Sequence, residues 1–404
     1  MCLIKFDAKC KINKTNKSTI IFWIVMKRIF LLFFFWLSVD GYVFAENSDC
    51  KLHHCIAIVD AGSTGSRLHI YAYDLNQLKQ PIGINEIWSK KIKPGFATLE
   101  PQQASIQSYL DQLFSNAPEA NIPVYFYATA GMRLQPIPRQ QSLYQILNLW
   151  FQQHPEWLLK ESKTITGNDE GVYGWLAVNY QLGGFDSPDK PLAAVMDMGG
   201  ASVQVTFPVD PSFTTDGHMI EELDVGGRHL ALFVRSFLGL GQTVLSQQFL
   251  EDENCFAIGY LLPNGLEANG DSQACQHDVT KLINNVHRVD QIVIPAMTRS
   301  LTTSWYVIGG AASLADDPLF SFPNGQFTNQ QLLLMADTKA CHQQWQVLYG
   351  QYPKNEYLYG SCLFPSYYYA LMVDGYGIKP NESIHYLPSG QGADWTLGVV
   401  LHQH

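Results

Sequence analysis

The sequence has few charged residues for its length, and it lacks long polar or single-residue tracts. Only 15% of its 404 residues are Asp, Glu, Lys or Arg, whereas 47% are hydrophobic. That balance excludes a disordered or fibrous chain and predicts a globular protein. A chain of 404 residues is too long for one ordinary hydrophobic core, so we expect two lobes.

Basic residues are too few for a nucleic-acid-binding surface. The chain has 26 Lys and Arg against 36 Asp and Glu, a formal net charge of -10. Residues 1–45 alone carry a net charge of +5, so the remainder is near -15. Such a charge repels nucleic-acid backbones. If the protein binds phosphate, it must do so with backbone N–H groups, a few local cations and a metal.

The eight cysteines do not show the spacing of zinc ligands, and no His pair accompanies them. Cys2 and Cys10 lie near the N-terminus, and the other six form an even set with local spacings. Such a set indicates disulfides formed in an oxidising compartment. Sequential pairing is the simplest hypothesis, which gives Cys50–Cys55, Cys255–Cys275 and Cys341–Cys362.

The N-terminal segment is predicted to be a leader rather than part of the fold. Starting at Met26, the expected true start, a short basic stretch precedes an apolar run from Ile29, and a small residue follows at Ala45. This pattern predicts a signal peptide cleaved after Ala45, and therefore a secreted or periplasmic protein. An uncleaved membrane anchor is the alternative, but the apolar run is short for a span. No apolar span follows Leu401, so we expect a soluble product without a membrane span.

The most informative feature is an internal echo between residues 55–73 and 193–207. Each segment has an apolar run, an Asp, a Gly-, Ser- or Thr-containing turn and a second apolar run, which predicts a β-hairpin. Asp60 aligns with Asp197. The echo predicts two lobes of one plan, with residues 46–173 plus 380–404 in the N-terminal lobe and 174–379 in the C-terminal lobe.

Other segments have clearer local periods. Strands are predicted over 123–130 and 305–308, and helices over 140–154, 239–250, 283–297 and 393–401. A further helix is expected to follow Gly167, with Asn168 or Asp169 as its N-cap. Glu170 then lies in the first turn of that helix.

The two Asp-headed turns are candidates for holding a phosphate chain. Turns rich in Gly, Ser and Thr can point successive N–H groups at an anion, and a strand-end Asp can face a metal through water. One such turn could equally be an ordinary hairpin, and DAGSTGSR lacks the Lys of a P-loop. Two turns together favour a shared polyphosphate. Arg133, at a strand end, could neutralise a terminal phosphate or pair with a surface carboxylate.

Glu170 is the candidate general base. Hydrolysis of a phosphoanhydride needs a water in line with the breaking bond, a group that orients and deprotonates it, and positive charge on the phosphoryl oxygens. A Glu in a first helical turn is also common for reasons of the helix dipole alone, so both interpretations stay open at this point.

Five segments together resemble a known family. DAGSTGSR (60–67), ATAGMR (128–133), GNDEGVYGWLAVN (167–179), DMGGASVQ (197–204) and QGADWTLG (391–398) are similar, in order, to the signature segments of the ecto-nucleoside triphosphate diphosphohydrolases, or apyrases. The resemblance is to a soluble, secreted, bacterial-type member. It implies an actin-like, ribonuclease H-like α/β fold, with a mixed five-stranded sheet flanked by helices in each lobe. It also implies an active site in the cleft between the lobes.

The resemblance further implies hydrolysis of nucleoside tri- and diphosphates to orthophosphate with Mg²⁺ or Ca²⁺, by water that Glu170 activates. Asp60 and Asp197 would hold the metal through water. The implied phosphate-binding residues are Ser63, Thr64, Gly65, Ser66, Arg67, Arg133, Gly200, Ala201 and Ser202. Thr129, Asn179, Gln204 and Trp395 would support the water and metal shell.

Other expectations concern the base, the partners and the rival functions. Tyr357 or Tyr367 could stack on a nucleobase, although core packing is an equal alternative for each. Nucleotides are the expected partners, and a monomer is expected. An exopolyphosphatase or a small-molecule kinase of the same superfold, or a non-catalytic nucleotide-binding protein, remains the alternative.

Overall fold

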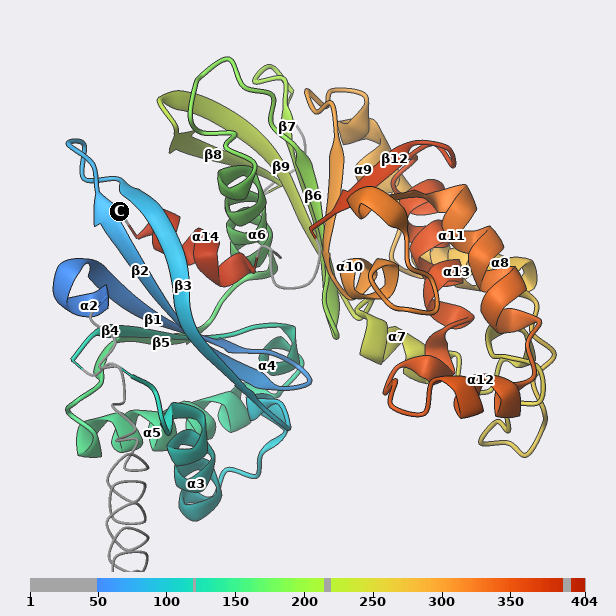
Figure 1. Cartoon of the computed structure of the whole chain (residues 1–404), viewed down its shortest axis with the longest axis horizontal. Coiled ribbons are helices and arrows are strands. Elements are labelled where there is room, and N and C mark those ends of the chain that lie inside the picture. The colour runs from blue at the N-terminus through green and yellow to red at the C-terminus, as the bar shows by residue number, and fades with distance from the viewer. Residues whose placement is uncertain (1–48, 119–120, 214–218, 388–393, 404) are drawn as a thin grey trace, which may run out of the picture. The chain divides into compact units, whose positions relative to one another are not determined.

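The computed structural model describes residues 49–118, 121–213, 219–387 and 394–403, which contain two mixed β-sheets with flanking helices (Figure 1). The predicted leader, with Met26 and the cleavage site after Ala45, lies outside the described residues. Within the described ranges, no helix is both long and apolar enough to cross a membrane.

The first sheet has five strands in the order β3-β2-β1-β4-β5. β1 pairs antiparallel with β2 and parallel with β4. β1 is a continuous apolar run because helices and side chains cover both of its faces. Helices α3 (Gln103–Phe114) and α5 (Ile137–Gln153) pack together beneath this sheet (Figure 1). The strands are β1 (His54–Ala61), β2 (Ser66–Leu75), β3 (Pro81–Ile92), β4 (Pro123–Ala128) and β5 (Leu158–Thr164).

The second sheet repeats this plan, which confirms the internal echo. β6 pairs antiparallel with β7 and parallel with β10, as β1 does with β2 and β4. The order is β11-β12-β10-β6-β7-β9-β8, so the sheet has seven strands rather than the expected five, because β8 and β11 extend its two edges. The strands are β6 (Ala194–Met198), β7 (Ser202–Val209), β8 (Ile220–Val225), β9 (Arg228–Leu238), β10 (Trp305–Gly309), β11 (Gln326–Thr328) and β12 (Ser383–Tyr386).

Two helices lie between the sheets and pack on each other. α6 (Gly167–Gln181) contacts β6, β7 and β9, and α14 (Trp395–His402) contacts β1, β2 and β3. Gly398 allows their close approach, since a Cβ there would overlap the backbone of Tyr173. β12 pairs with β10, so this strand belongs to the second sheet although 380–404 is expected in the N-terminal lobe. The lobe boundaries otherwise stay a prediction.

In the second half of the chain, the structure differs from one of the expected helices. The segment 283–297 is not one helix, because a π-helical turn ends near Val286 and Arg288 adopts a left-handed φ of 53°. A new helix begins at Val289. This helix is α9 (Val289–Met297), and the remaining helices are α2 (Asp49–Leu52), α4 (Ala130–Arg133), α7 (Gln242–Gln248), α8 (Ser272–Lys281), α10 (Gly310–Ala315), α11 (Asn329–Ala336), α12 (Trp345–Gln351) and α13 (Leu363–Tyr369).

Within the described ranges, short helical turns join these elements. Three are π-helical, at Leu282–Val286, Asp337–Cys341 and Ala370–Gly375. Four are 3-10 turns, at Phe96–Thr98, Glu253–Cys255, Pro323–Gly325 and Leu358–Gly360.

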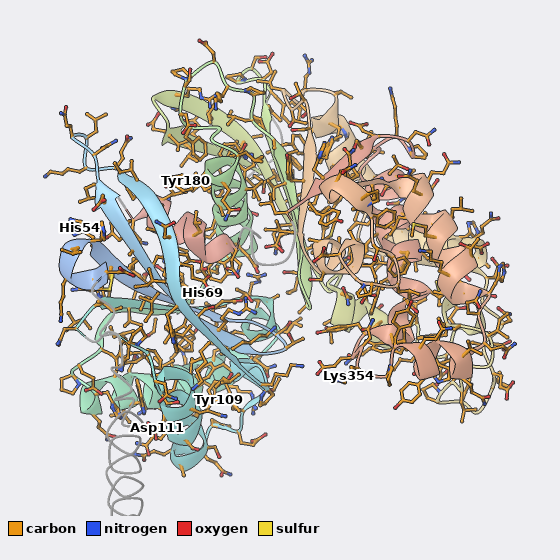
Figure 2. All side chains as sticks on the ribbon, viewed as in Figure 1. His54, His69, Tyr109, Asp111, Tyr180 and Lys354 are labelled. Atoms are coloured by element: carbon orange, nitrogen blue, oxygen red, sulfur yellow. A yellow bond between two sulfur atoms is a disulfide. The ribbon has the colours of Figure 1, made fainter. Side chains whose placement is uncertain are left out.

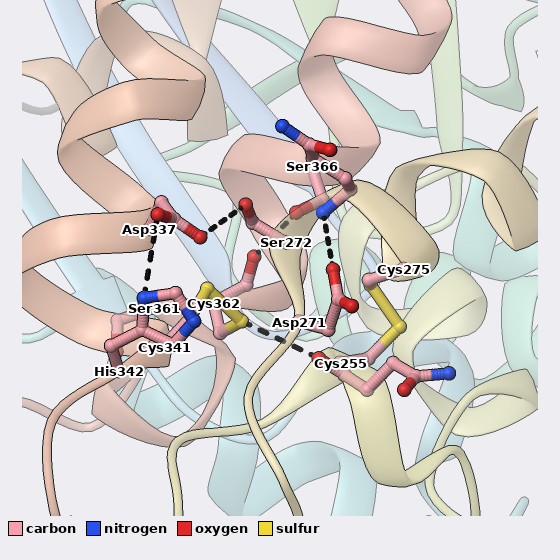
Figure 3. Close-up of a disulfide and its surroundings, with 12 residues drawn as sticks. Cys255, Asp271, Ser272, Cys275, Asp337, Cys341, His342, Ser361, Cys362 and Ser366 are labelled. Atoms are coloured by element: carbon pink, nitrogen blue, oxygen red, sulfur yellow. Dashed lines mark hydrogen bonds and ion pairs between the residues drawn. A yellow bond between two sulfur atoms is a disulfide. The ribbon is translucent and has the colours of Figure 1, made fainter.

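All three predicted disulfides are present, namely Cys50–Cys55, Cys255–Cys275 and Cys341–Cys362. The last two lie close together (Figure 3), and they tie the turn ending at Cys255 to α8 and the turn ending at Cys341 to the N-cap of α13. Cys362 Sγ lies 3.7 Å from the carbonyl oxygen of Asn254, which precedes Cys255. These bonds fit an oxidising compartment.

Candidate active site between the two Asp-headed hairpins

The turns of the two matching hairpins line one cavity of about 460 Å³. Such a volume is in the range of small-ligand sites. The two turns face each other closely, because a Cβ added to Gly200 would lie 2.4 Å from Ser63 Oγ. The predicted site residues in its wall are Asp60, Ser63, Thr64, Gly65, Arg67, Thr129, Glu170, Asp197, Gly200, Ala201, Ser202, Tyr357 and Trp395.

The strand register fixes what stands beside each Asp. Asp60 is opposite Arg67 in the first hairpin, and Asp197 is opposite Gln204 in the second. The first turn is further fixed from below, since a Cβ on Gly131 would lie 2.8 Å from Ser63 Cα. The second turn is held by hydrogen bonds from the Gln242 and Thr243 N–H groups to the Gly199 and Gly200 carbonyls, so both turns are positioned before any ligand arrives, as an anion-binding loop requires.

Glu170 projects from the start of α6 into the cavity. The N-cap of this helix is Thr166, whose hydroxyl accepts from the Asp169 N–H while the Asp169 carboxylate accepts from the Thr166 N–H. This capping box corrects the expected cap at Asn168 or Asp169. Glu170 is 7% exposed, and its Oε2 accepts hydrogen bonds from Arg133 Nη2 at 2.7 Å and Gln204 Nε2 at 3.0 Å.

Ser202 and Gln204 extend this network along β7. Ser202 Oγ lies 2.9 Å from Arg133 Nη2 and 2.8 Å from Gln204 Nε2. Gln204 Oε1 is buried and has no hydrogen-bond partner among the described residues. A buried acceptor without a partner is costly, and a water held next to Glu170 would satisfy it.

Four carboxylates give this end of the cavity its electrostatic character. Burial raises the pKa of Asp60, Asp197 and Glu170, and the neighbouring carboxylates raise the first two further. For Asp394, burial is outweighed by the His69 imidazole, two Thr396 hydrogen bonds and Arg67, so its pKa is lowered. An acidic cluster of this kind needs positive charge to stay ionised.

The donor set suits a hard divalent cation. Asp60 Oδ1 is buried without a hydrogen-bond partner among the described residues, and carboxylate oxygens are the ligands that Mg²⁺ and Ca²⁺ prefer. The described residues contain no group of three or more His, Cys, Asp or Glu placed to ligate a metal directly. The arrangement therefore fits a cation held by Asp60 and Asp197 through its water shell, with other oxygens supplied by phosphate.

A buried histidine on β2, His69, lies close to Asp394. His69 is 0% exposed, its Nδ1 lies 2.9 Å from Glu86 Oε2, and its Nε2 lies 3.6 Å from Asp394 Oδ2. Figure 2 marks His69 on the first sheet. The His69 imidazole thus lies between the Glu86 and Asp394 carboxylates, behind the acidic end of the cavity.

Several predicted residues do not line the cavity. Arg133 stands behind Glu170, and its Nη1 donates to the Ile165 carbonyl at 3.0 Å, so it holds the carboxylate rather than offering a free fork to phosphate. Asn179 binds the backbone of Trp175 and Ala193, which ties α6 to β6. The side chains of Ser66 and Gln204 are also buried outside the cavity wall.

The two tyrosines proposed for base stacking lie in different environments, one buried and one exposed. Tyr367 is 0% exposed and its hydroxyl donates to the Leu240 carbonyl, so it belongs to the core and cannot reach a base. Tyr357 is 45% exposed and lines the cavity. The prediction for Tyr367 is thereby corrected, because its helix α13 buries that face.

Sequence reasoning missed several cavity residues. Asp394 stands next to the predicted Trp395 and had a signal within the last signature segment. Lys91, on β3, and the pair Asp317 and Asn355 lie outside any motif and had none. Their positions depend on how distant segments meet.

Curated relatives match most of this chain. It is 24% identical over 417 residues to ectonucleoside triphosphate diphosphohydrolase 1 of Rattus norvegicus, covering 85% of this chain and 80% of that protein. It is likewise 24% identical over 437 residues to probable apyrase 3 of Arabidopsis thaliana, covering 89% and 86%. A guanosine-diphosphatase of Schizosaccharomyces pombe is 32% identical over 220 residues, which are 50% of this chain and 39% of that protein.

Solved structures agree on the fold. A nucleoside triphosphate hydrolase of Neospora caninum superposes with a TM-score of 0.57 at 15% identity, covering 87% of this chain and 92% of that one. A Ppx/GppA family member of Aquifex aeolicus gives a TM-score of 0.54 at 14% identity, covering 87% and 97%. The two-lobed actin-like architecture expected from the resemblance is thus confirmed. A family model matches residues 47–258, more than half of the sequence, and the chain therefore belongs to the GDA1/CD39 (nucleoside phosphatase) family.

Proposed function

We propose that this protein hydrolyses nucleoside tri- and diphosphates, releasing orthophosphate stepwise from NTP to NDP to NMP. The observation that carries this proposal is the buried Glu170 carboxylate, held by Arg133 beside two facing Asp-headed turns. Membership of a nucleoside phosphatase family and the names of the matched relatives support the same substrate class.

In this proposal the phosphate chain lies between the turns. Backbone N–H groups around Ser63 to Gly65 and Gly200 to Ser202, with Arg67 and Lys91 nearby, contact the phosphate oxygens. A divalent cation, when bound through its waters to Asp60 and Asp197, would neutralise phosphoryl charge. The cation is Mg²⁺ or Ca²⁺, and Thr129 and Trp395 lie at the edge of its water shell.

Glu170 orients the attacking water. The water donates a hydrogen bond to the Glu170 carboxylate, which lines the cavity and is held in place by Arg133 and Gln204. Its oxygen forms the new bond to the terminal phosphorus as the bond to the bridging oxygen breaks. The proton passes to Glu170 and then to solvent, and the shorter nucleotide carries the bridging oxygen away. No covalent enzyme intermediate is needed.

Two finer features complete the proposal. Tyr357, the exposed ring in the cavity wall, stacks on the nucleobase. The protein is exported by cleavage after Ala45, and it acts as a monomer in an extracellular or periplasmic space, which the three disulfides favour.

The test is orthophosphate release from ATP, ADP, GTP, GDP and inorganic polyphosphate, with and without EDTA and with and without an acceptor alcohol. We expect nucleotide hydrolysis that EDTA abolishes and that needs no acceptor. Glu170→Gln should lower kcat about 10²- to 10⁴-fold with the fold intact, while Glu251→Gln, an exposed position, should not. Release from polyphosphate alone would favour an exopolyphosphatase, and dependence on the acceptor would favour a kinase.

A further inference from the structure

The cavity continues beyond the phosphate-type turns into a region of different chemistry. Its wall there is largely apolar, formed by Leu314, Leu319, Phe320, Tyr357 and Phe364. Phe320 and Phe364 are each 1% exposed, so core packing fixes the positions of their rings in this wall. A wall of this kind suits a flat aromatic ligand such as a nucleobase.

Two polar side chains interrupt this wall, and they are bonded to each other. Asp317 Oδ2 accepts a hydrogen bond from Asn355 Nδ2 at 2.8 Å. Asp317 Oδ1 accepts from the Leu319 N–H at 2.8 Å. Asn355 Oδ1 in turn accepts from the Tyr357 N–H at 2.9 Å. The Asp317 carboxylate is therefore fixed relative to the backbone of Tyr357 before a ligand binds.

Each oxygen of the Asp317 carboxylate can accept a further hydrogen bond. An ionised carboxylate offers about four lone-pair sites, and the protein uses one on each oxygen of Asp317. One site on each oxygen remains for a ligand that lines up two adjacent N–H donors. Because one carboxylate can accept two parallel bonds, such a ligand gains both strength and orientation.

We propose that Asp317 accepts hydrogen bonds from the donor edge of guanine, so that guanine nucleotides are the preferred substrates. This inference rests on the proposed function. Guanine presents two neighbouring donors, N1–H and the N2 amino group, whereas adenine presents a ring acceptor, N1, beside its amino group. Uracil presents a single donor between two carbonyl oxygens. Only guanine therefore matches both oxygens of Asp317.

The ribose hydroxyls are the other donors that a carboxylate in this cavity could meet. The position of Asp317 favours the base, because Asn355 joins it to the backbone of Tyr357 and because the surrounding wall is apolar. The experiment below separates these two partners by removing base donors and sugar hydroxyls independently.

The test measures kcat/KM for GDP, IDP, ADP, 2′,3′-dideoxy-GDP and 2′,3′-dideoxy-ADP with the full chain and its cation. We expect GDP to exceed ADP about 10-fold or more, in line with one good bidentate contact. IDP, which lacks the N2 amino group, should fall between them. The dideoxy nucleotide should keep the advantage of guanine over adenine seen with the ribonucleotides, when compared with 2′,3′-dideoxy-ADP.

The matched variants are Asp317→Asn and Asp316→Asn. In the first, the ratio of GDP to ADP should fall to about 3 or less, because an amide supplies only one acceptor oxygen. In the second, an exposed neighbour outside the cavity wall, the ratio should stay as in the original protein. The ratio within one variant is insensitive to a partial loss of folded protein.

Three outcomes would overturn the inference while leaving nucleotide hydrolysis intact. One is equal kcat/KM for all bases, and another is an unchanged GDP to ADP ratio in Asp317→Asn. The third is an equal loss of kcat/KM for both bases with the dideoxy sugars that is absent in Asp317→Asn, which would assign Asp317 to the ribose. A protein that hydrolyses no nucleotide would instead overturn the proposed function itself.

Discussion

Arg133 Nη2 donates a hydrogen bond to Glu170 Oε2 across 2.7 Å, and this contact joins the end of α4 to the first turn of α6. Both side chains are largely buried, at 15% and 9% exposure. Burial raises the pKa of Glu170, whereas the Arg133 cation opposes that rise. Arg133 therefore keeps the proposed base ionised and fixes its direction.

Replacing Arg133 should move the acid limb of the pH–rate profile. Without the cation, the pKa of Glu170 rises further, so a larger fraction of the base is protonated at a given pH. We expect Arg133→Gln to shift the acid limb of kcat/KM upward by about one pH unit. Arg133→Lys, which keeps the charge, should shift it less. If the acid limb of both variants stayed at the pH of the original protein, Glu170 would not be the titrating base.

Replacing His69 should lower activity without touching the cavity wall. His69→Gln removes the imidazole 3.6 Å from Asp394 Oδ2, whose influence lowers the pKa of that carboxyl, so the pKa of Asp394 should rise. We expect kcat/KM to fall about 10-fold, a typical loss for a supporting group behind a metal-holding site. His54→Gln, on the exposed end of β1, is the matched control. The two positions are marked in Figure 2.

Unfolding must be excluded in that experiment. Thermal melts should show both histidine variants folded at the assay temperature, so that the loss reflects the site. If His69→Gln and His54→Gln were equally active, the Glu86–His69–Asp394 chain would have only a packing role.

Divalent cations should stabilise the protein, and more so at neutral than at acidic pH. The folded-state pKa values of Asp60 and Asp197 are raised above 3.8, so ionising these groups destabilises the fold increasingly as pH rises from 3.8 through the folded-state pKa. A bound cation offsets that repulsion. We expect Mg²⁺ or Ca²⁺ to raise Tm at pH 7 and to raise it less at pH 5.

Removing one of these carboxylates should also stabilise the cation-free protein, because it removes part of the repulsion. Asp60→Asn should raise the cation-free Tm by about 2 °C and shrink the cation-dependent rise. Asp189→Asn, on an exposed loop, should change neither quantity. A cation effect that persists in full in Asp60→Asn would place the cation elsewhere.

A methyl group at Gly200 should separate the two turns. Its Cβ would lie 2.4 Å from Ser63 Oγ and 3.4 Å from Thr64 Cγ2, so Ser63 must turn away. Because small misplacements of contact groups are costly, we expect Gly200→Ala to lower kcat/KM about 10-fold or more. Gly350→Ala, where a Cβ meets nothing within 4 Å, is the control. Full activity in Gly200→Ala would mean that the turns do not close on one phosphate chain.

The sequence by itself determined both hairpins and the helix that carries Glu170. Each hairpin is a local structure, because apolar runs on either side of a Gly-rich turn pair with each other. The disulfides are also close in sequence, which made sequential pairing correct. The cap of α6 was placed two or three residues too late, since Thr166 competes with Asn168 and Asp169 and only the backbone direction decides.

Tertiary structure alone decided which side chains face the cavity. Tyr357 and Tyr367 come from one Tyr-rich segment, yet one is exposed in the cavity and the other is in the core. His69 meets Asp394 across 325 residues of chain, as do the neighbouring hydroxyls of Tyr71 and Thr396. Periodicity and turn chemistry act over a few residues, whereas these meetings depend on how two sheets and the helices between them pack.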